Sequence, residues 1–215
     1  TSKISRFKKS IIVYGNTDFL KKFRLNYINI DLKKNLFSSQ TKNYVNKFIS
    51  LEKKTNSSII EVHNRPSYIH ILNSKIKDKI LTLYFHNDPL SMDGSKSIEQ
   101  RKKLLKICYK IIFNSNWSKK RFLEGLENKF VNSNKLVVFF QSAKKRSLSI
   151  IKEKKNWITF VGKLNNAKGY DVFAKTIRII LDKFPGWRAK IIGDEKREKI
   201  AVNHKNVDLM GFLNH

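Results

Sequence analysis

The chain has 215 residues, of which 40% are hydrophobic and 12% aromatic, which suffices for one large or two small domains and excludes a disordered or low-complexity protein. Its 45 lysines and arginines against 17 aspartates and glutamates give a formal net charge of +28. A single cysteine, Cys108, excludes both a disulfide scaffold and a zinc ribbon and points to a reducing compartment.

In the first part of the chain, short apolar runs alternate with helical patterns. Because the runs are almost continuously apolar, they predict strands covered on both faces; they are Ser10–Tyr14, Ser58–Val62, Ile80–Phe85, Lys110–Phe113 and Lys135–Phe139. Helices are expected over Thr41–Lys54, from Ser97 onward with Gln100 completing a capping box, and over Asn116–Leu126. This alternation predicts an α/β fold with parallel strands.

The apolar pattern lapses into a basic, polar stretch between Gln141 and Asn156. We therefore assign residues 1–145 to a first domain, 146–156 to a linker and 157–215 to the start of a second domain. A new βαβ unit opens the second domain; its expected elements are a strand over Trp157–Val161, a helix over Tyr170–Phe184 with Thr176 and Phe184 in its buried stripe, and a strand over Trp187–Ile192.

The loop between that strand and helix carries the most specific chemistry. It leads into a helix N-terminus, where free backbone N–H groups and the helix dipole favour an anion. Gly162 and Gly169 allow close backbone approach, and Lys163 and Lys168 add two positive charges. The spacing is neither that of a Walker loop nor that of a dinucleotide fingerprint. A diphosphate site and a solvated lysine-rich loop are the two alternatives.

The run from Phe160 to Glu195, followed by His204 to His215, resembles the start of the donor-binding domain of GT-B glycosyltransferases. The similarity is greatest to the retaining group called glycosyl transferases group 1, or family four. That family opens its second domain with strand-G-[RK]-L-x-x-x-K-G, which Gly162, Lys163, Leu164, Lys168 and Gly169 match. The resemblance implies that the two lysines hold the donor's diphosphate. It also implies nucleotide-binding roles for Gly193, Asp194, Gly211 and Phe212, with His215 closing a G-[FY]-x-x-H segment.

The first domain is similar to the same family at the ends of three predicted strands, where α/β proteins bind ligands. The resemblance implies that His86 is the catalytic-site histidine, which positions the acceptor or the sugar across the interdomain cleft and is not a general base. The acceptor-side candidates are His63, Asn64, Arg65, Asn87, Asn114 and Ser115. For His63 the alternative is a ring satisfied by a loop carbonyl. Ser115 is also expected to cap a helix.

The fold that the resemblance implies is α/β, with two Rossmann-like doubly wound domains of GT-B type, both incomplete. We expect a fragment that lacks the glycine-rich loop preceding Ser10–Tyr14 and the paired glutamates beyond His215, and that is inactive alone. The implied reaction transfers a sugar from a nucleotide-diphosphate sugar to a hydroxyl acceptor with retention, in bacterial surface glycan or lipopolysaccharide synthesis. No cofactor and no metal are expected.

The charge, which is spread evenly over both halves of the chain, leaves alternatives open. A solvated lysine-rich surface explains it, as does an anionic membrane that binds Lys103, Lys106 and Lys110 on one helical face. The rival functions are a nucleic-acid-binding α/β protein and an inactive GT-B scaffold. No nucleic-acid-binding motif is visible, so no nucleic-acid partner is expected. Without an apolar run near the roughly 20 residues of a membrane span or a signal-peptide pattern, we expect a cytoplasmic protein. Docking on the inner face of the cytoplasmic membrane is an alternative that the family resemblance implies, beside a plain solvated helix face.

Overall fold

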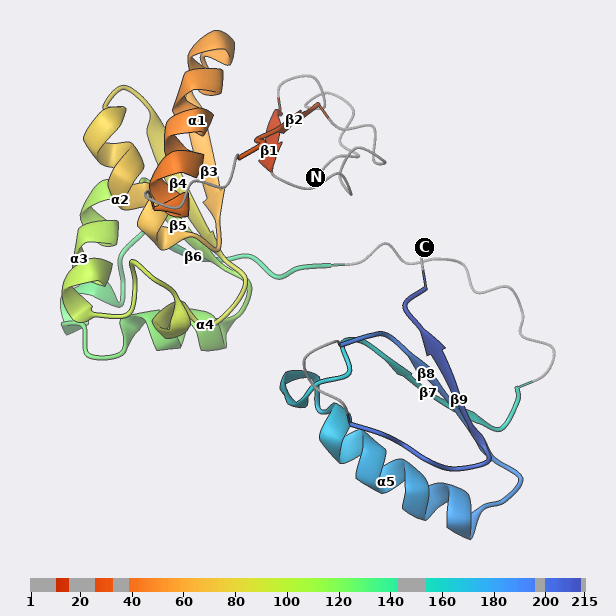
Figure 1. Ribbon diagram of the computed structural model, residues 1–215. Helices are drawn as coiled ribbons and strands as arrows, with labels where there is room; N and C mark the ends of the chain where they lie inside the picture. The colour runs from red at the N-terminus through yellow and green to blue at the C-terminus, as the bar shows by residue number, and fades with distance from the viewer. Residues whose placement is uncertain (1–10, 16–25, 33–38, 143–153, 196–199, 214–215) are drawn as a thin grey trace. The chain divides into compact units, whose positions relative to one another are not determined.

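The computed structural model describes residues 11–15, 26–32, 39–142, 154–195 and 200–213 (Figure 1). The chain divides between residues 143 and 144 into two compact units, here called unit 1 and unit 2. Every strand pairing in either unit is parallel, and helices connect most of the strands. The α/β class with parallel strands that the sequence predicts is therefore confirmed.

Unit 1 is built around a four-stranded parallel sheet of order β3-β4-β5-β6. Its strands are β3 (Ile59–His63), β4 (Ile80–Phe85), β5 (Lys110–Phe113) and β6 (Leu136–Val138). Its helices are α1 (Gln40–Thr55), α2 (Pro66–Lys75), α3 (Ile98–Ile107) and α4 (Asn116–Leu123), with 3-10 turns η3 (Pro89–Ser91) and η4 (Asn128–Phe130). Helix α1 packs on α2 and α2 packs on α3. The register places His63 opposite Tyr84, so the chain leaves β3 and β4 at the same edge of the sheet.

The core of unit 1 is one continuous apolar cluster between this sheet and its helices. Strand β4 hides five of its six side chains, as expected of a central strand that is apolar almost throughout. The rings of Phe85, Phe113 and Phe122 lie 5.4 to 5.7 Å apart at its centre and are fully buried. Burying a side chain of this size stabilises the fold by roughly 1.5–3 kcal/mol.

A two-stranded parallel sheet of β1 (Val13–Gly15) and β2 (Tyr27–Asn29) packs beside α1. The Tyr14 hydroxyl donates a hydrogen bond to the Glu52 carboxylate at 3.1 Å, and the Tyr14 ring meets Phe48 edge-on at 4.8 Å. Glu52 is 2% exposed and also accepts hydrogen bonds from Thr55 and Ser57. The burial of this carboxylate is therefore compensated by hydrogen bonds, which also hold the small sheet on α1.

Unit 2 contains a three-stranded parallel sheet of order β7-β8-β9. Its strands are β7 (Trp157–Val161), β8 (Arg188–Ile192) and β9 (Val207–Gly211), and between β7 and β8 lie η5 (Asn166–Lys168) and α5 (Tyr170–Lys183). Figure 1 shows α5 running along one side of the sheet. The helix buries side chains spaced by three or four residues, as an amphipathic helix should: Tyr170, Ala174, Ile177 and Leu181.

Several sequence predictions need correction. In α5, Thr176 is exposed and Phe184 is 49% exposed, because the buried stripe runs through Ala174 and the helix ends before Phe184. Helix α4 ends at Leu123 and not at Leu126, since Gly125 adopts a left-handed φ of 73° that stops the helix. Helix α2 and strand β2 were not predicted. The capping box of Ser97 and Gln100 is confirmed.

Candidate functional site

Polar side chains gather at the carboxyl edge of the unit 1 sheet. Asn64 follows β3, His86 follows β4 and Asn114 follows β5. The main-chain N–H of His86 donates to Asn64 Oδ1 at 2.7 Å, and Asn114 Nδ2 donates to the His86 carbonyl oxygen at 2.7 Å. Asn64 has a φ of 53°, in the left-handed region that asparagine enters more readily than most residues. The main chain of His86 is thus fixed by residues from both neighbouring strands.

The side chains of His63 and His86 lie within hydrogen-bond distance, with His63 Nδ1 and His86 Nε2 2.7 Å apart. Glu61 Oε1 lies 2.8 Å from His63 Nε2, and Gln141 Nε2 lies 2.6 Å from His86 Nδ1. An ionised Glu61 only accepts, so His63 carries its hydrogen on Nε2 and accepts on Nδ1 from His86 Nε2–H. His86 Nδ1 then accepts from the Gln141 amide. This assignment of tautomers satisfies the whole chain of contacts.

Three rings stack along this edge. The Tyr84 and His86 rings are 4.3 Å apart and almost parallel, and His63 lies 5.4 Å from Tyr84. The Tyr84 hydroxyl donates to the Phe139 carbonyl oxygen at 2.9 Å. The alternative interpretation of His63, a ring satisfied by a loop carbonyl, is wrong in the described part of the chain, because its ring nitrogens contact Glu61 and His86.

The electrostatics of this cluster set the protonation states of Glu61, at one end, and His86, at the other. The hydrogen bond from His63 lowers the pKa of Glu61. Burial lowers the pKa of His86 below 6.5, and repulsion from the His63 ring, when that ring is protonated, lowers it further. At neutral pH, Glu61 is therefore ionised and His86 neutral. A neutral ring with both nitrogens in hydrogen bonds is suited to positioning a ligand, because accepting a proton at Nδ1 would first require the Gln141 bond to open.

The remaining unit 1 candidates lie at the same edge but differ in their partners. Ser115 caps α4 as predicted, because its Oγ accepts the Ser118 N–H at 3.2 Å. The side chain of Ser118 in turn donates to Asn114 Oδ1 at 3.0 Å. Asn87 is exposed and makes no side-chain hydrogen bond within the described ranges. Arg65, also exposed, donates from Nη1 to the Asn64 carbonyl oxygen at 3.2 Å.

In unit 2, three glycines bring the strand ends together. The Gly162 N–H donates to the Ile192 carbonyl oxygen at 3.0 Å, and the Gly193 N–H donates to the Gly211 carbonyl oxygen at 2.8 Å. A Cβ on Gly193 would lie 1.8 Å from the Gly162 carbonyl oxygen, and Gly193 has a φ of 146°. Only glycine permits this approach. Three of the four glycines that the family resemblance singled out therefore meet at one edge of the sheet, and the fourth, Gly169, lies at the start of α5.

The loop after Gly162 forms the 3-10 turn η5 and then a left-handed residue, Gly169 with a φ of 70°, so it is distinct from α5. The Asn165 carbonyl oxygen accepts the N–H groups of Lys168 and Tyr170 at 3.1 and 3.2 Å. The Asn165 side chain donates to Glu195 at 3.2 Å. Sequence reasoning missed Asn165, because the family motif leaves its position unspecified.

Lys163 and Lys168 are exposed, and within the described residues no carboxylate lies at ion-pair distance from either. They flank a loop that leads directly into α5, whose N-cap, Gly169, makes no side-chain bond. Two uncompensated cations before a helix N-terminus favour an anion. Asp194 and Phe212 are also exposed, the latter by 73%. His215 lies outside the described residues.

The basic helical face expected between Arg101 and Lys110 contains fewer lysines than the sequence predicts. Lys103 and Lys106 lie on α3, but Lys110 is in β5, where its Nζ donates to the Asn134 carbonyl oxygen at 2.7 Å. Arg101 is 3% exposed. Among the helices that the structure describes, none is long and apolar enough to cross a membrane. Within the same ranges, no group of three or more His, Cys, Asp or Glu side chains is placed to hold a metal ion.

No protein-family model matches the sequence, and neither does any curated protein. Solved structures do match. Anabaena Alr3699/HepE in complex with UDP-glucose aligns over 97% of this chain and 63% of its own, with a TM-score of 0.69 and 14% identity. TarM aligns over 80% and 36%, with a TM-score of 0.56 and 12% identity. The S. aureus MnaA–UDP structure aligns over 90% and 57%, with a TM-score of 0.52 and 13% identity.

These similarities show the fold. The chain has the α/β architecture of GT-B type, with Rossmann-like units of parallel strands, as the family resemblance implies. It spans 63% of the length of the Anabaena protein that it matches. At 14% identity the match carries the arrangement of strands and helices and not the roles of individual residues.

Proposed function

We propose that this chain belongs to an enzyme that transfers a sugar from a nucleotide-diphosphate sugar to a hydroxyl acceptor. The loop of unit 2 carries the proposal, because two exposed lysines without a carboxylate partner in the described residues precede the N-terminus of α5. Such a loop is suited to a diphosphate. The solved structures of the same fold that contain UDP or UDP-glucose support a nucleotide sugar as the ligand.

In the proposed reaction, the bond between the sugar's anomeric carbon and the diphosphate oxygen breaks, and the acceptor oxygen forms the new bond. The acceptor's proton passes to the leaving phosphate, and we propose that the anomeric configuration is retained. Negative charge grows on the leaving oxygens, where Lys163, Lys168 and the N–H groups of the first turn of α5 that follow Tyr170 would stabilise it by a few kcal/mol. Because protein groups neutralise this charge, the proposal includes no metal.

The acceptor side of the proposal rests on the unit 1 cluster. His86 positions the acceptor hydroxyl or the donor sugar, while Glu61 and His63 set its tautomer and Asn64 and Asn114 fix its main chain. We propose a glycan or lipid-linked acceptor in bacterial surface glycan or lipopolysaccharide synthesis. The exposed lysines would support docking on an anionic membrane surface from the cytoplasmic side.

Thermal-shift titration with UDP, GDP and their sugars tests the donor half. We expect UDP or GDP to raise the melting temperature, because a ligand that binds only the folded state stabilises it. The rise should disappear in Lys168→Ala. Lys175→Ala is the matched control, since Lys175 is an exposed lysine further along α5, and this variant should keep the response.

The two rival functions give different results in the same samples. A nucleic-acid-binding protein would ignore nucleotides and bind RNA with an affinity that falls steeply with salt. An inactive scaffold would bind UDP and, even as the full-length protein to which this chain belongs, would transfer no sugar from UDP-sugars to any acceptor offered. Nucleotide binding that depends on Lys168, together with a glycosylated product, supports the proposal against both.

A further inference from the structure

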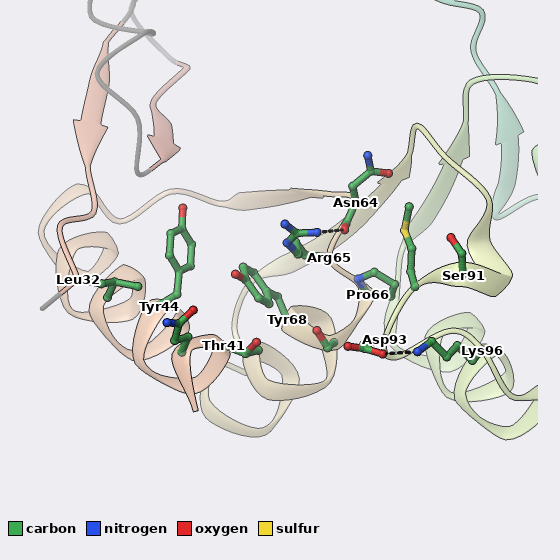
Figure 2. A pocket seen from close by; sticks show the side chains of 13 residues that line it. Leu32, Thr41, Tyr44, Asn64, Arg65, Pro66, Tyr68, Ser91, Asp93 and Lys96 are labelled. Atoms are coloured by element: carbon green, nitrogen blue, oxygen red, sulfur yellow. Dashed lines mark hydrogen bonds and ion pairs between the residues drawn. The ribbon is translucent and has the colours of Figure 1, made fainter. Parts of the chain in front are cut away.

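A pocket of about 500 Å³ lies at the carboxyl edge of the unit 1 sheet (Figure 2). The start of α1, the start of α2 and the segment after β4 line it, among them Thr41, Tyr44, Asn64, Arg65 and Tyr68. Its volume is typical of sites for small ligands. Asn64 joins the pocket to the histidine pair, because this side chain accepts the His86 N–H and also lines the pocket.

Arg65 supplies the uncompensated charge of this pocket. Its Nη1 donates to the Asn64 carbonyl oxygen, and no carboxylate of the described ranges forms an ion pair with it. The other charged side chains of the lining, Lys96 and Asp93, pair with each other at 2.7 Å. A guanidinium presents a planar fork of donors that fits the oxygens of a phosphate or a carboxylate. The pocket is therefore electrostatically suited to an anion.

Two tyrosines form a wall of the same pocket. The rings of Tyr44 and Tyr68 stack at 5.3 Å with 30° between their planes. Figure 2 shows Arg65 next to Tyr68, on the side toward Asn64. Burial raises the pKa of Tyr44 to about 12. Its hydroxyl is a hydrogen-bond donor at neutral pH, as that of an ordinary tyrosine is. Tyrosine offers an apolar ring and a polar tip, which matches the apolar face and the hydroxyls of a sugar ring.

We propose that this pocket binds the acceptor, and that the acceptor is a sugar carrying a phosphate or carboxylate group. Arg65 pairs with the anionic group while the tyrosine pair holds the sugar ring. The designation of this ligand as an acceptor rests on the proposed glycosyl transfer. The binding of an anionic sugar rests on the pocket alone.

The experiment is an amide NMR titration of the ¹⁵N-labelled 215-residue chain with four probes. Glucose 6-phosphate and glucuronate carry both a ring and an anionic group, whereas methyl glucoside lacks the charge and inorganic phosphate lacks the ring. We expect glucose 6-phosphate or glucuronate to shift the amides of Arg65, Ser67 and Tyr68. Methyl glucoside and inorganic phosphate should each bind roughly tenfold more weakly, because each lacks one set of contacts. Which anionic sugar binds more tightly distinguishes phosphate from carboxylate.

Variants test the assigned residues. Arg65→Gln should weaken the binding of the anionic sugar roughly tenfold, and Arg65→Lys by less, because it keeps the charge but loses the fork. Lys103→Gln removes one exposed positive charge from α3 and should leave binding unchanged. If Arg65→Gln does not fold, Tyr68→Leu tests the same wall: it should weaken glucose 6-phosphate and leave inorganic phosphate unaffected.

Three results would overturn the inference: shifted amides that lie away from the pocket, methyl glucoside that binds as tightly as the anionic sugars, or no shift up to tens of millimolar ligand. UDP added to the same sample separates this inference from the proposed function. UDP shifts at Gly162–Gly169 without anionic-sugar shifts in unit 1 would overturn the pocket alone. The reverse pattern would overturn the donor half alone and leave the anionic-sugar site standing.

Discussion

Both units carry polar groups at the carboxyl edge of their parallel sheets. The two edges differ in whether the polar side chains bond to other side chains of the same edge. In unit 1, Glu61, His63, His86 and Gln141 bond to one another in a chain of contacts between 2.6 and 2.8 Å. In unit 2, main-chain bonds at glycines join the strand ends, and the flanking lysines have no carboxylate partner among the described residues. The edge of unit 1 is preorganised by its own side chains. At the edge of unit 2 the positive charge of the lysines is available to an anionic ligand.

The apolar cores of the two units differ in size. Fifteen buried residues form the apolar cluster of unit 1, whereas three form that of unit 2 in the part of the chain that is described. Tyr170, Ala174 and Ile191 are also buried in unit 2, and its strand-end geometry depends on backbone approach. A single added methyl group at the glycine edge should consequently have a large effect.

The largest effect is expected for Gly193→Ala. Its Cβ would overlap the Gly162 carbonyl oxygen, and its φ is unfavourable for alanine, so unit 2 should lose roughly 3 kcal/mol of unfolding free energy. Urea unfolding followed by tryptophan fluorescence measures it, in a Trp117→Phe background that leaves Trp157 and Trp187 as the reporters of unit 2. Gly186→Ala is the matched control, because nothing lies within 4 Å of the added methyl. Equal stability of the two variants would refute the close approach.

A smaller effect is expected at the edge of unit 1. Ser115→Ala removes the side-chain cap of α4 and should cost about 1 kcal/mol. Ser39→Ala is the control, because Ser39 is the N-cap of α1 and makes no side-chain cap bond. Chemical denaturation of both variants checks the difference. Indistinguishable midpoints would show that the Ser115 cap does not contribute to stability.

A still smaller effect concerns pH, because solvent screens the half-exposed Glu61–His63 pair. The pKa of Glu61 is lowered from 4.5, so its contribution to stability is present above pH 4.5 and is lost as pH falls through the folded-state value. Glu61→Gln should flatten that acid dependence. Acid titration of the unfolding free energy of both forms measures it, and unchanged curves would contradict the assignment.

The same substitution should move the titration of His86. The negative charge of Glu61 raises the pKa of His86, so Glu61→Gln should lower the pH at which the His86 ring protonates. Imidazole NMR signals followed from about pH 4 to pH 8 report the midpoint. A higher His86 midpoint would have the wrong sign for this account.

No effect is expected from removing divalent metal. If the lysine loop alone neutralises the leaving diphosphate, sugar transfer by the full-length enzyme to which this chain belongs should continue in EDTA. Measurement of the transferred sugar with and without the chelator decides this. Activity that is lost in EDTA and restored by Mg²⁺ would place a metal in the donor site.

Much of the fold follows from the sequence, because β4 and β7 are almost continuously apolar and their bounds match the predicted ones. Helix α2 was missed because Pro66 marks a turn in a sequence pattern, although proline is well tolerated in the first turn of a helix. Strand β2 has three residues, too few to display a period. The Ser115 cap is predictable because the segment from Phe113 to Ser118 resembles the family's strand-to-helix turn, in which serine caps the helix.

The candidate site was only partly predictable, because its contacts depend on register. His63 and His86 were separate candidates, and their contact follows from the pairing of His63 with Tyr84. Gln141 was assigned to a polar stretch before the linker, yet its side chain bonds to His86. Tyr44 fits the apolar stripe of α1 in the sequence but lines the pocket. When a side chain contacts residues of another element, the sequence pattern around it does not predict that contact.

A titration of the ¹⁵N-labelled chain with UDP, followed amide by amide, tests the central claim most directly. The account predicts saturable shifts at Gly162, Lys163, Gly169 and Gly193 that weaken at least tenfold in Lys168→Ala and persist in Lys175→Ala. Amides at these positions that remain unchanged at saturating UDP and, in a parallel sample, at saturating GDP would contradict it, as would shifts that Lys168→Ala leaves intact.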